Sequence, residues 1–496
     1  MKPSRWLPLL CLLLLAVFAV GALPMLDEES YLDMAAQVAD HRGQPYGWWR
    51  AWQPWGNDPT GDTSLFAHPP LHWLWLSIWQ PLLGYGFALR LVSGAPWALI
   101  LGWAVGRLCE LHLERPAVGA VLWLASPVVL LGFQLSLMVD LPVLALGTAA
   151  MALWSARKPE LAGALLAAAC FAKYPALVIW GVWIPLAFRQ PRLLLRAAWP
   201  FALLFFGGQA FLYASTGHIH LLHVLQSAGE IGRGPLLERA IGTLVRLGLT
   251  LSPGAGSPAA AGVAALPAGL AVLSLDLDGG VLLTALLAGW GGALLAMAAL
   301  GLREHQSRLL GLWALLSVGA VIFGHNYVGG RYLLPATVPL ALLGAQHLER
   351  WLPERLRAYG AVLALPWGLL GLALVHAERQ HAQAWAELAE RIVVASPEKG
   401  VFTGEWTFRY VMRERGWTYH SPAPLPAGTL LAVPTHASPA IQGHGELLFS
   451  AQVGGPGLRL VDLEQGVGYH AETLGPRPFA WSQGPLASGQ LFRVEP

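Results

Sequence analysis

Charged side chains are scarce in this chain of 496 residues, and their scarcity excludes most soluble proteins. Asp, Glu, Lys and Arg make up 12% of the sequence, against about 25% in an ordinary soluble domain. A water-soluble fold of this length could not cover its surface with so little charge. The formal net charge is +2 and no basic cluster occurs, so the composition also argues against nucleic-acid binding.

Cysteine is scarce as well. The three cysteines, Cys11, Cys109 and Cys170, lie within or beside apolar runs, so no disulfide framework is implied. Apolar residues are abundant instead, because they make up 55% of the chain and the mean hydropathy is +0.50. This content excludes an intrinsically disordered or collagen-like chain and predicts an integral membrane protein.

Apolar runs of the length that crosses a bilayer recur from the N-terminus to about residue 376. The first, residues 6–23, could be a cleavable signal peptide, but its length favours an uncleaved helix. The Trp-rich stretch 69–83 predicts an interfacial helix, because indole rings favour the headgroup level. The further predicted spans are residues 87–108, 117–135, 140–156, 160–172, 174–188, 197–213, 236–251, 258–275, 281–301, 308–324, 331–348 and 357–376.

The chain is therefore predicted to be a polytopic all-α membrane protein with about 11–13 transmembrane helices. The two counts differ by the pair 236–251 and 258–275. Arg239 and Arg246 lie in the first of these, which would also fit an amphipathic helix on the membrane surface. Lys and Arg are more frequent in the short loops on the side of the N-terminus, so the positive-inside rule predicts a cytoplasmic N-terminus and a periplasmic or extracellular C-terminus.

From about residue 377 charges become frequent, and the apolar runs shorten to strand length. We predict a transmembrane domain over residues 1–376 and a small exterior α/β domain over residues 377–496. Its predicted elements are strands at 400–403, 429–433, 447–450, 458–463 and 491–494, and a helix at 405–415.

Acidic residues gather on the predicted exterior face. Asp27, Glu28 and Glu29 follow the first helix directly. Adjacent carboxylates repel one another and favour protonation unless a positive group binds them, although a solvated acidic cap on the helix end is the alternative. Asp140 is predicted on the same face, where it either caps a helix or takes part in a site.

Cations are predicted on this face too. Lys173 lies between two spans and Arg331 begins one. A charge at such a position is costly unless it is paired, although a snorkelling side chain would reach the lipid headgroups. His68 precedes Pro69 and Pro70, and a double proline holds the backbone extended, which suits a loop held against a ligand.

The order of these motifs resembles the GT-C superfamily of membrane glycosyltransferases. It is most similar to the bacterial branch related to protein O-mannosyltransferases and lipid A aminoarabinose transferases. The resemblance covers roughly residues 1–376, and the spacing of Asp27-Glu28 to His68-Pro69-Pro70 is its most specific part. Aminoarabinose transferases carry Lys where this chain has His68, which weakens the case for lipid A as acceptor. The other motifs are Ala88-Leu89-Arg90-Leu91, the Asp140 loop, Lys173-Tyr174-Pro175 and Arg331-Tyr332-Leu333-Leu334-Pro335.

The resemblance implies an inverting glycosyltransferase of the bacterial inner membrane. Such an enzyme moves a sugar, either a hexose or a pentose, from a polyprenyl-phosphate donor to a hydroxyl of a protein, lipid or glycan. A carboxylate then accepts the hydroxyl proton while cations hold the departing phosphate. We assign Asp27 as the base and Glu28 as the residue that orients either Asp27 or the acceptor. Asp140 is a second acidic residue, which would orient either the acceptor or Lys173. The predicted donor-phosphate residues are Lys173, Arg331, His68 and Arg90.

A metal site is a separate hypothesis. The spacing of His218, His220 and His223 permits a divalent metal, although the sequence shows no fourth ligand. Hydrogen bonding to headgroups or to the donor is the alternative. No cofactor is required by the sequence.

Two other functions stay open from the sequence. A transporter or flippase of lipid-linked sugars would also explain many spans with charges between them. A non-catalytic envelope assembly protein is the third hypothesis. The sequence shows no internal symmetry and its candidate charges gather on one face, which favours the glycosyltransferase.

Overall fold

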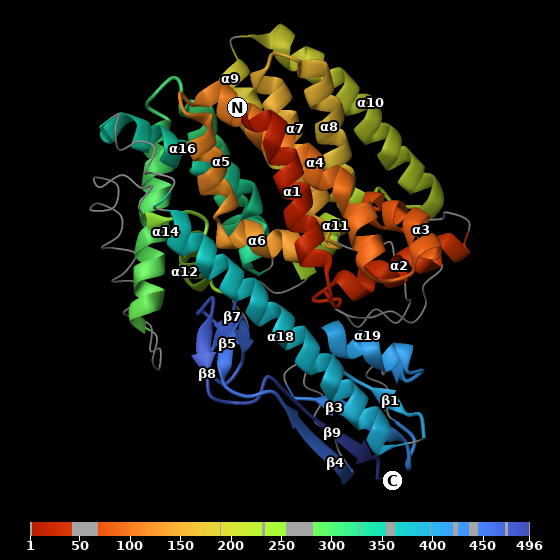
Figure 1. Cartoon of the computed structure of the whole chain (residues 1–496). Helices are drawn as coiled ribbons and strands as arrows, with labels where there is room; N and C mark the ends of the chain where they lie inside the picture. The colour runs from red at the N-terminus through yellow and green to blue at the C-terminus, as the bar shows by residue number, and fades with distance from the viewer. Residues whose placement is uncertain are drawn as a thin grey trace.

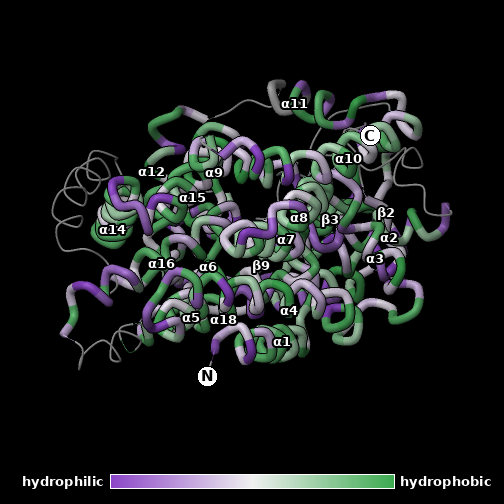
Figure 2. The backbone as a smooth tube through the Cα atoms, turned by 90° about the horizontal axis from the view of Figure 1, so that it is seen from above, coloured by the Kyte–Doolittle hydropathy of each residue, from purple (hydrophilic) through white to green (hydrophobic). Residues whose placement is uncertain are grey.

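A computed structural model describes residues 2–41, 68–188, 190–230, 234–253, 281–325, 327–353, 362, 364–396, 398–419, 425–435, 445–471 and 475–495. Helices pack into a bundle, and a smaller domain that contains the described strands lies at one end of it (Figure 1). Helix α18, Leu365–Ala395, runs from the bundle into this second domain (Figure 1). Figure 2 shows hydrophobic residues along most helices of the bundle, as expected where helices face lipid.

Many bundle helices begin at a proline, whose missing N–H would have no partner in the first turn of a helix. The helices are α1 (Pro3–Ala19), α2 (Glu28–Asp40), α3 (Leu71–Leu83), α4 (Phe87–His112), α5 (Pro116–Leu124), α6 (Pro127–Gln134), α7 (Asp140–Ser155), α8 (Pro159–Ala172), η2 (Tyr174–Leu177), α9 (Val178–Ala187), α10 (Pro191–Thr216), α11 (His220–Glu230), α12 (Leu236–Leu247), α14 (Val281–Gly301), α15 (Arg308–Gly319), η4 (Ala320–Gly324), η5 (Gly330–Leu333) and α16 (Leu334–Trp351).

These helices confirm most of the predicted helical runs, with one correction. The run 117–135 is divided into α5 and α6, which are bent by 62° to each other. Ser126 before Pro127 has extended backbone angles, because a residue that precedes proline avoids the helical conformation. The predicted span 258–275 lies outside the described residues.

Three described helices, α4, α10 and α14, are each long and apolar enough to cross a membrane, and α5 with α6 makes a fourth if the bent pair is one span. Five shorter apolar helices lie beside them, at Pro3–Ala19, Asp140–Ser155, Pro159–Ala172, Tyr174–Ala187 and Arg308–Gly324. The chain is a mostly helical integral membrane protein, and the count of about 11–13 spans stays a prediction.

Glycine allows the helices of the bundle to touch backbone to backbone. A Cβ atom at Gly106 of α4 would lie 2.5 Å from the backbone nitrogen of Ser4 in α1. A Cβ atom at Gly163 of α8 would lie 2.0 Å from the carbonyl oxygen of Ala197 in α10. Such close packing is the main attraction between helices in lipid, where burial of apolar surface supplies little.

The amphipathic helix α12 is largely buried in the protein after its exposed first turn. Arg239 is 3% exposed and Arg246 is fully buried. Arg246 donates hydrogen bonds to the carbonyl groups of Gly468, Tyr469 and Gly475 in the second domain. The hypothesis of a surface helix is therefore wrong, because protein covers the polar face of α12.

The second domain is built on a five-stranded sheet in the order β2-β1-β3-β9-β4. Strand β1 pairs in parallel with β2 and β3, whereas β9 is antiparallel to β3 and β4. Helix α19, Trp406–Glu414, connects β1 to β2. A carboxy-terminal region of short strands is thus confirmed. The strands are β1 (Val401–Phe402), β2 (Thr418–Tyr419), β3 (Leu430–Pro434), β4 (Glu446–Val453), β5 (Gly457–Arg459), β6 (Val461–Asp462), β7 (Val467–Gly468), β8 (Ala480–Ser482) and β9 (Ala487–Arg493).

Helix α18 passes through residue 377, where we placed the domain boundary, without a break. Its carboxy-terminal part belongs to the core of the second domain, where Trp385, Leu388 and Ile392 pack with Phe402 and Leu491. The two domains are therefore joined by a continuous helix and not by a loop.

Gly163→Ala should lower the stability of the protein in detergent. The added methyl group would lie 2.0 Å from the carbonyl oxygen of Ala197, so α8 and α10 would have to separate. We expect a cost of about 1–3 kcal/mol, measured as a lower midpoint of thermal unfolding. Gly207→Ala is the matched control, because Gly207 in α10 has open space around it. Equal midpoints for the two variants would contradict the close packing.

Candidate active site

Asp27 lies where the loop after α1 turns into α2. Leu26 before it has a φ angle of 50°, in the left-handed region that side-chain-bearing residues rarely adopt. Asp27 is the N-cap residue of α2, yet its side chain makes no capping hydrogen bond. Its Oδ2 atom lies 3.0 Å from Nη1 of Arg331 instead, and its side chain is only 14% exposed. Asp27 is thus paired with a cation that is distant in the sequence, and it is not a solvated helix cap.

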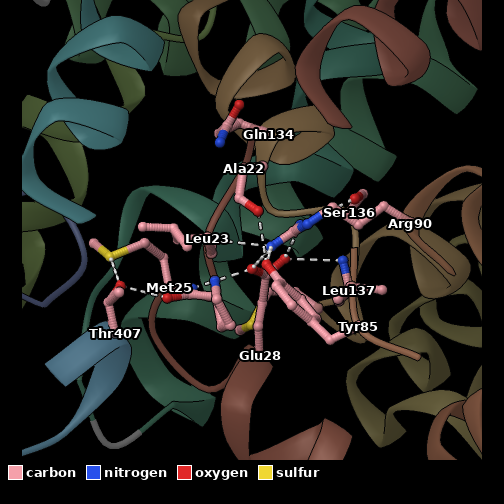
Figure 3. A network of polar contacts seen from close by, with 12 residues as sticks. Ala22, Leu23, Met25, Glu28, Tyr85, Arg90, Gln134, Ser136, Leu137 and Thr407 are labelled. Atoms are coloured by element: carbon pink, nitrogen blue, oxygen red, sulfur yellow. Dashed lines mark hydrogen bonds and ion pairs between the residues drawn. The ribbon is translucent and has the colours of Figure 1, made fainter. Parts of the chain in front are cut away.

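The carboxylate of Glu28 holds this turn in place (Figure 3). It accepts hydrogen bonds of 2.9 Å and 2.7 Å from the two Nη atoms of Arg90. It also accepts hydrogen bonds from the backbone N–H groups of Met25, at 3.1 Å, and Leu137, at 2.9 Å. Glu28 is fully buried. Its oxygens are thus occupied by donors from three segments of the chain, which fits a residue that positions Asp27.

The structure brings Asp27, Asp140, Lys173 and Arg331 together from four distant segments. Nζ of Lys173 donates a hydrogen bond of 2.8 Å to Oδ1 of Asp140, beside the Asp27–Arg331 pair. The exposed fractions of the side chains are 6% for Lys173, 12% for Asp140 and 8% for Arg331. Two carboxylates and two cations therefore form one nearly buried cluster whose charges balance.

Tyr332 contacts both cations of this cluster. Nζ of Lys173 lies 4.6 Å from the centre of its ring, and the guanidinium carbon of Arg331 lies 5.0 Å from it. Arg331 also donates hydrogen bonds to the hydroxyl groups of Tyr332, at 3.0 Å, and Tyr327, at 3.3 Å. The ring of His325 stacks on Tyr332 with 4.2 Å between centroids. The aromatic rings fix the directions in which the cations point.

A small cavity of about 60 Å³ lies beside the cluster, between α7, α9 and α15. Asp140, Lys173 and Arg331 lie in its wall together with Tyr332 and His325. The remaining lining is mostly apolar: Val143, Leu144, Gly147, Thr148, Pro175, Ala176, Val178, Ile179, Trp313, Ser317, Ala320, Val321, Leu334 and Pro335. The cavity thus combines charges with a wall that suits a hydrocarbon chain.

The other predicted phosphate residues lie in different places. His68 stacks on Tyr31, with 6.3 Å between ring centroids, and interacts electrostatically with Asp140. Arg90 is fully buried and contacts Glu28, Ser136 and Tyr85. Arg90 therefore stabilises the turn that carries Asp27, through its bonds to Glu28. His68 lies close to the cluster.

The three histidines predicted for a metal do not converge. Nδ1 of His220 lies 2.7 Å from the hydroxyl of Tyr174, whereas His218 and His223 stack on each other at 5.1 Å. Among the described residues, no group of three or more His, Cys, Asp or Glu side chains could hold a metal ion. A metal at this position is supported only by the spacing in the sequence.

Sequence reasoning missed three aromatic residues of the site, Tyr327, Tyr332 and His325. Tyr332 was part of the Arg331 motif, and its place next to a cation was the available signal. Nothing in the local sequence of Tyr327 or His325 indicates that they turn toward Arg331. Their role follows from the path of the chain between η4 and η5.

Helix α2 is also held from outside the membrane domain, by α19. Arg413 pairs with Glu29 at 2.9 Å and with Asp33. Arg409 lies 3.2 Å from Glu29 and 3.0 Å from Glu405. Burial raises the pKa of Glu29, an effect that Arg409 opposes. No local pattern in the sequence indicates that cations of the second domain lie near the acidic turn.

No protein-family model and no curated protein matches the chain. Among solved structures it is similar to "Crystal Structure of ArnT from Cupriavidus metallidurans in the apo state", with 86% of this chain and 91% of that chain covered. The sequence identity is 13% and the TM-score is 0.38. A likeness of this degree carries no argument about activity, so the function is inferred from the site.

Arg90→Met should destabilise the protein by about 3–5 kcal/mol, because it leaves the buried carboxylate of Glu28 without its charged partner. Thermal unfolding in detergent measures the loss. Arg107→Met is the control in the same helix, since Arg107 is 39% exposed and an exposed pair contributes less than about 1 kcal/mol. Similar losses for both variants would show that the Glu28 network does not hold the turn.

Glu405 should make the second domain more stable in mild acid. Burial raises the pKa of Glu405 from 4.5 to about 7, although Arg409 opposes the shift. The folded protein therefore keeps a proton that the unfolded chain releases, so this stability is complete below pH 4.5 and is lost as the pH rises through 7. Between roughly pH 5.5 and pH 8 we expect a loss of about 2 kcal/mol.

The pH dependence of thermal unfolding, compared between wild type and Glu405→Gln, measures this effect. Gln cannot ionise, so the variant should lose less stability as the pH rises. Glu390→Gln is the control, since the side chain of Glu390 is 41% exposed. A wild type that gains stability from pH 5.5 to pH 8 relative to Glu405→Gln would contradict the prediction.

Proposed function

We propose that this protein is an inverting glycosyltransferase of the bacterial inner membrane. It transfers a sugar from a polyprenyl-phosphate donor to an acceptor hydroxyl at the outer face. The observation that supports this most is the position of two cations and two carboxylates in and beside the wall of a largely apolar cavity. A lipid-linked sugar phosphate has the same division into an anionic head and a hydrocarbon tail.

Lys173 and Arg331 bind the donor phosphate in this proposal. Both are nearly buried, so a bond between them and a phosphate is little screened by water. The apolar wall formed by α7, α9 and α15 receives the first part of the polyprenyl chain. Without donor, each cation is paired with a carboxylate, and the incoming phosphate competes with that carboxylate for it.

Asp27 is the general base. The acceptor oxygen attacks the anomeric carbon and its proton passes to the Asp27 carboxylate. The bond from the anomeric carbon to the phosphate oxygen breaks, and its electron pair leaves with the phosphate, where Lys173 and Arg331 stabilise the charge. A single displacement inverts the anomeric centre, so no covalent carboxylate intermediate is needed, by analogy with inverting glycosidases. Asp140 orients Lys173, from which it accepts a hydrogen bond.

Asp27→Asn should abolish transfer, because the amide cannot accept the hydroxyl proton. Loss of a general base lowers the rate by about 10²–10⁴-fold. The measurement uses purified protein in detergent, a panel of labelled polyprenyl-phosphate sugars and an envelope extract as acceptor. Asp40→Asn is the matched control, because it makes the same change at an exposed residue of the same helix.

The outcomes separate the proposals. Donor consumption and labelled product with wild type and Asp40→Asn, but not with Asp27→Asn, would support the enzyme and identify the sugar. Near-normal transfer by Asp27→Asn would contradict its role as base. Tight donor binding by wild type without any consumption would favour the transporter.

A further inference from the structure

The second domain contacts both chain segments that form the Asp27–Arg331 pair. The segment before Asp27 meets α19, where Thr407 donates a hydrogen bond to the carbonyl oxygen of Pro24. The segment before Arg331 meets a loop of the second domain, because the N–H of Gly330 donates a hydrogen bond of 2.9 Å to the carbonyl oxygen of Tyr469. The second domain thus contacts both the segment that precedes Asp27 and the segment that precedes Arg331.

The contact at Gly329 and Gly330 is too close for any larger residue. A Cβ atom at Gly329 would lie 2.3 Å from the carbonyl oxygen of His470, and one at Gly330 would lie 2.3 Å from the ring of Tyr469. Gly329 has an extended backbone that any residue can adopt. Glycine is therefore required at these positions by the approach of the second domain and not by the backbone of η5.

The loop that makes this contact is itself held firmly. Arg246 of α12, fully buried, donates hydrogen bonds to the carbonyl groups of Gly468 and Tyr469. Nε2 of His470 lies 3.0 Å from Oε1 of Glu378 in α18. The N–H of Tyr469 donates a hydrogen bond of 2.8 Å to the carbonyl oxygen of Leu460. Contacts from α12, α18 and the neighbouring strand region fix Tyr469, which in turn limits the movement of Gly330.

The contact with α2 is made by charges. Arg413 of α19 pairs with both Glu29 and Asp33, which are the second and sixth residues after Asp27. Arg409 adds a second cation to Glu29 and is 2% exposed. These pairs cross between the domains and hold the first turns of α2, on which the direction of Asp27 depends.

We propose that the carboxy-terminal domain is a positioning element of the active site. Through Arg413 on one side and Tyr469 on the other, it sets the position of Asp27 relative to Arg331. The inference rests on the proposed function for its kinetic consequences. It assigns a role to a domain for which the sequence indicated none.

The two contacts should have different kinetic signatures. Arg413→Ala removes the pairs with Glu29 and Asp33 and so loosens the first turns of α2, which displaces Asp27 while Lys173 and Arg331 still hold the donor. We expect kcat to fall on the order of tenfold to a hundredfold, with the KM for donor unchanged. Arg413→Lys should restore part of the loss, because it keeps a cation beside Glu29. Arg415→Ala is the matched control at the C-cap of α19, since Arg415 pairs with Glu390 away from α2.

Gly330→Ala should instead raise the KM for donor, because the methyl group would displace the segment that carries Arg331. Adding Tyr469→Ala removes the ring that the methyl group meets, so the double variant should recover donor affinity. Gly324→Ala is the control at the end of η4, where a Cβ atom meets nothing within 4 Å. If Arg413→Ala and Gly330→Ala acted only by destabilising the whole protein, each would lower both kcat and donor affinity. Neither Arg413→Lys nor the added Tyr469→Ala would then restore the loss, and the positioning role would be overturned.

Hydrogen exchange of the full chain provides a measurement that does not depend on activity. Exchange should increase in residues 24–33 for Arg413→Ala and in residues 327–333 for Gly330→Ala, each relative to its control. If wild type transfers no sugar but these increases occur, the proposed function fails and the positioning role stands. If wild type transfers sugar and both variants match it in rate and exchange, the positioning role is overturned while the proposed function stands.

Discussion

The buried ion pair between Glu28 and Arg90 is the interaction on which the rest of the site depends. Burying two charges is costly, and the cost is offset only when their remaining hydrogen-bonding groups are also satisfied. Here the backbone N–H groups of Met25 and Leu137 donate the remaining hydrogen bonds to the Glu28 carboxylate. Met25 precedes Asp27 by two residues and Leu137 precedes Asp140 by three. The same carboxylate therefore holds the two segments that carry the acidic residues of the cluster.

The cluster itself follows from the same constraint. Lys173 and Arg331 face a largely apolar cavity, where an unpaired charge would be unfavourable. Each is paired with a carboxylate and lies beside the ring of Tyr332. A balanced set of charges of this kind is stable without ligand, yet it offers two cations to any phosphate that can exchange with the carboxylates. In the proposed function, binding and release of a charged lipid headgroup would therefore need little rearrangement of the bundle.

The sequence allowed much of this to be predicted, for reasons that differ between elements. The run 87–108 and helix α4 agree because a long apolar segment in lipid has to satisfy its own backbone hydrogen bonds. Asp27, Asp140, Lys173 and Arg331 could be grouped because charges at the ends of apolar runs are rare and the topology places them on one face. Arg90 was harder to interpret. An arginine that binds phosphate and one that is buried against Glu28 look the same in the sequence, and only the contacts separate them.

The sequence by itself determined that the chain is a helical membrane protein with a carboxy-terminal region of short strands, because hydrophobic length and periodicity are local properties. It also placed the main charges on one side. The tertiary structure alone decided which charge pairs with which, that α12 turns its arginines inward, and that the second domain contacts the segments next to both Asp27 and Arg331. These features depend on contacts between residues far apart in the chain, such as Gly330 with Tyr469 and Glu29 with Arg413. No local pattern encodes them, since each requires the two domains to be packed together.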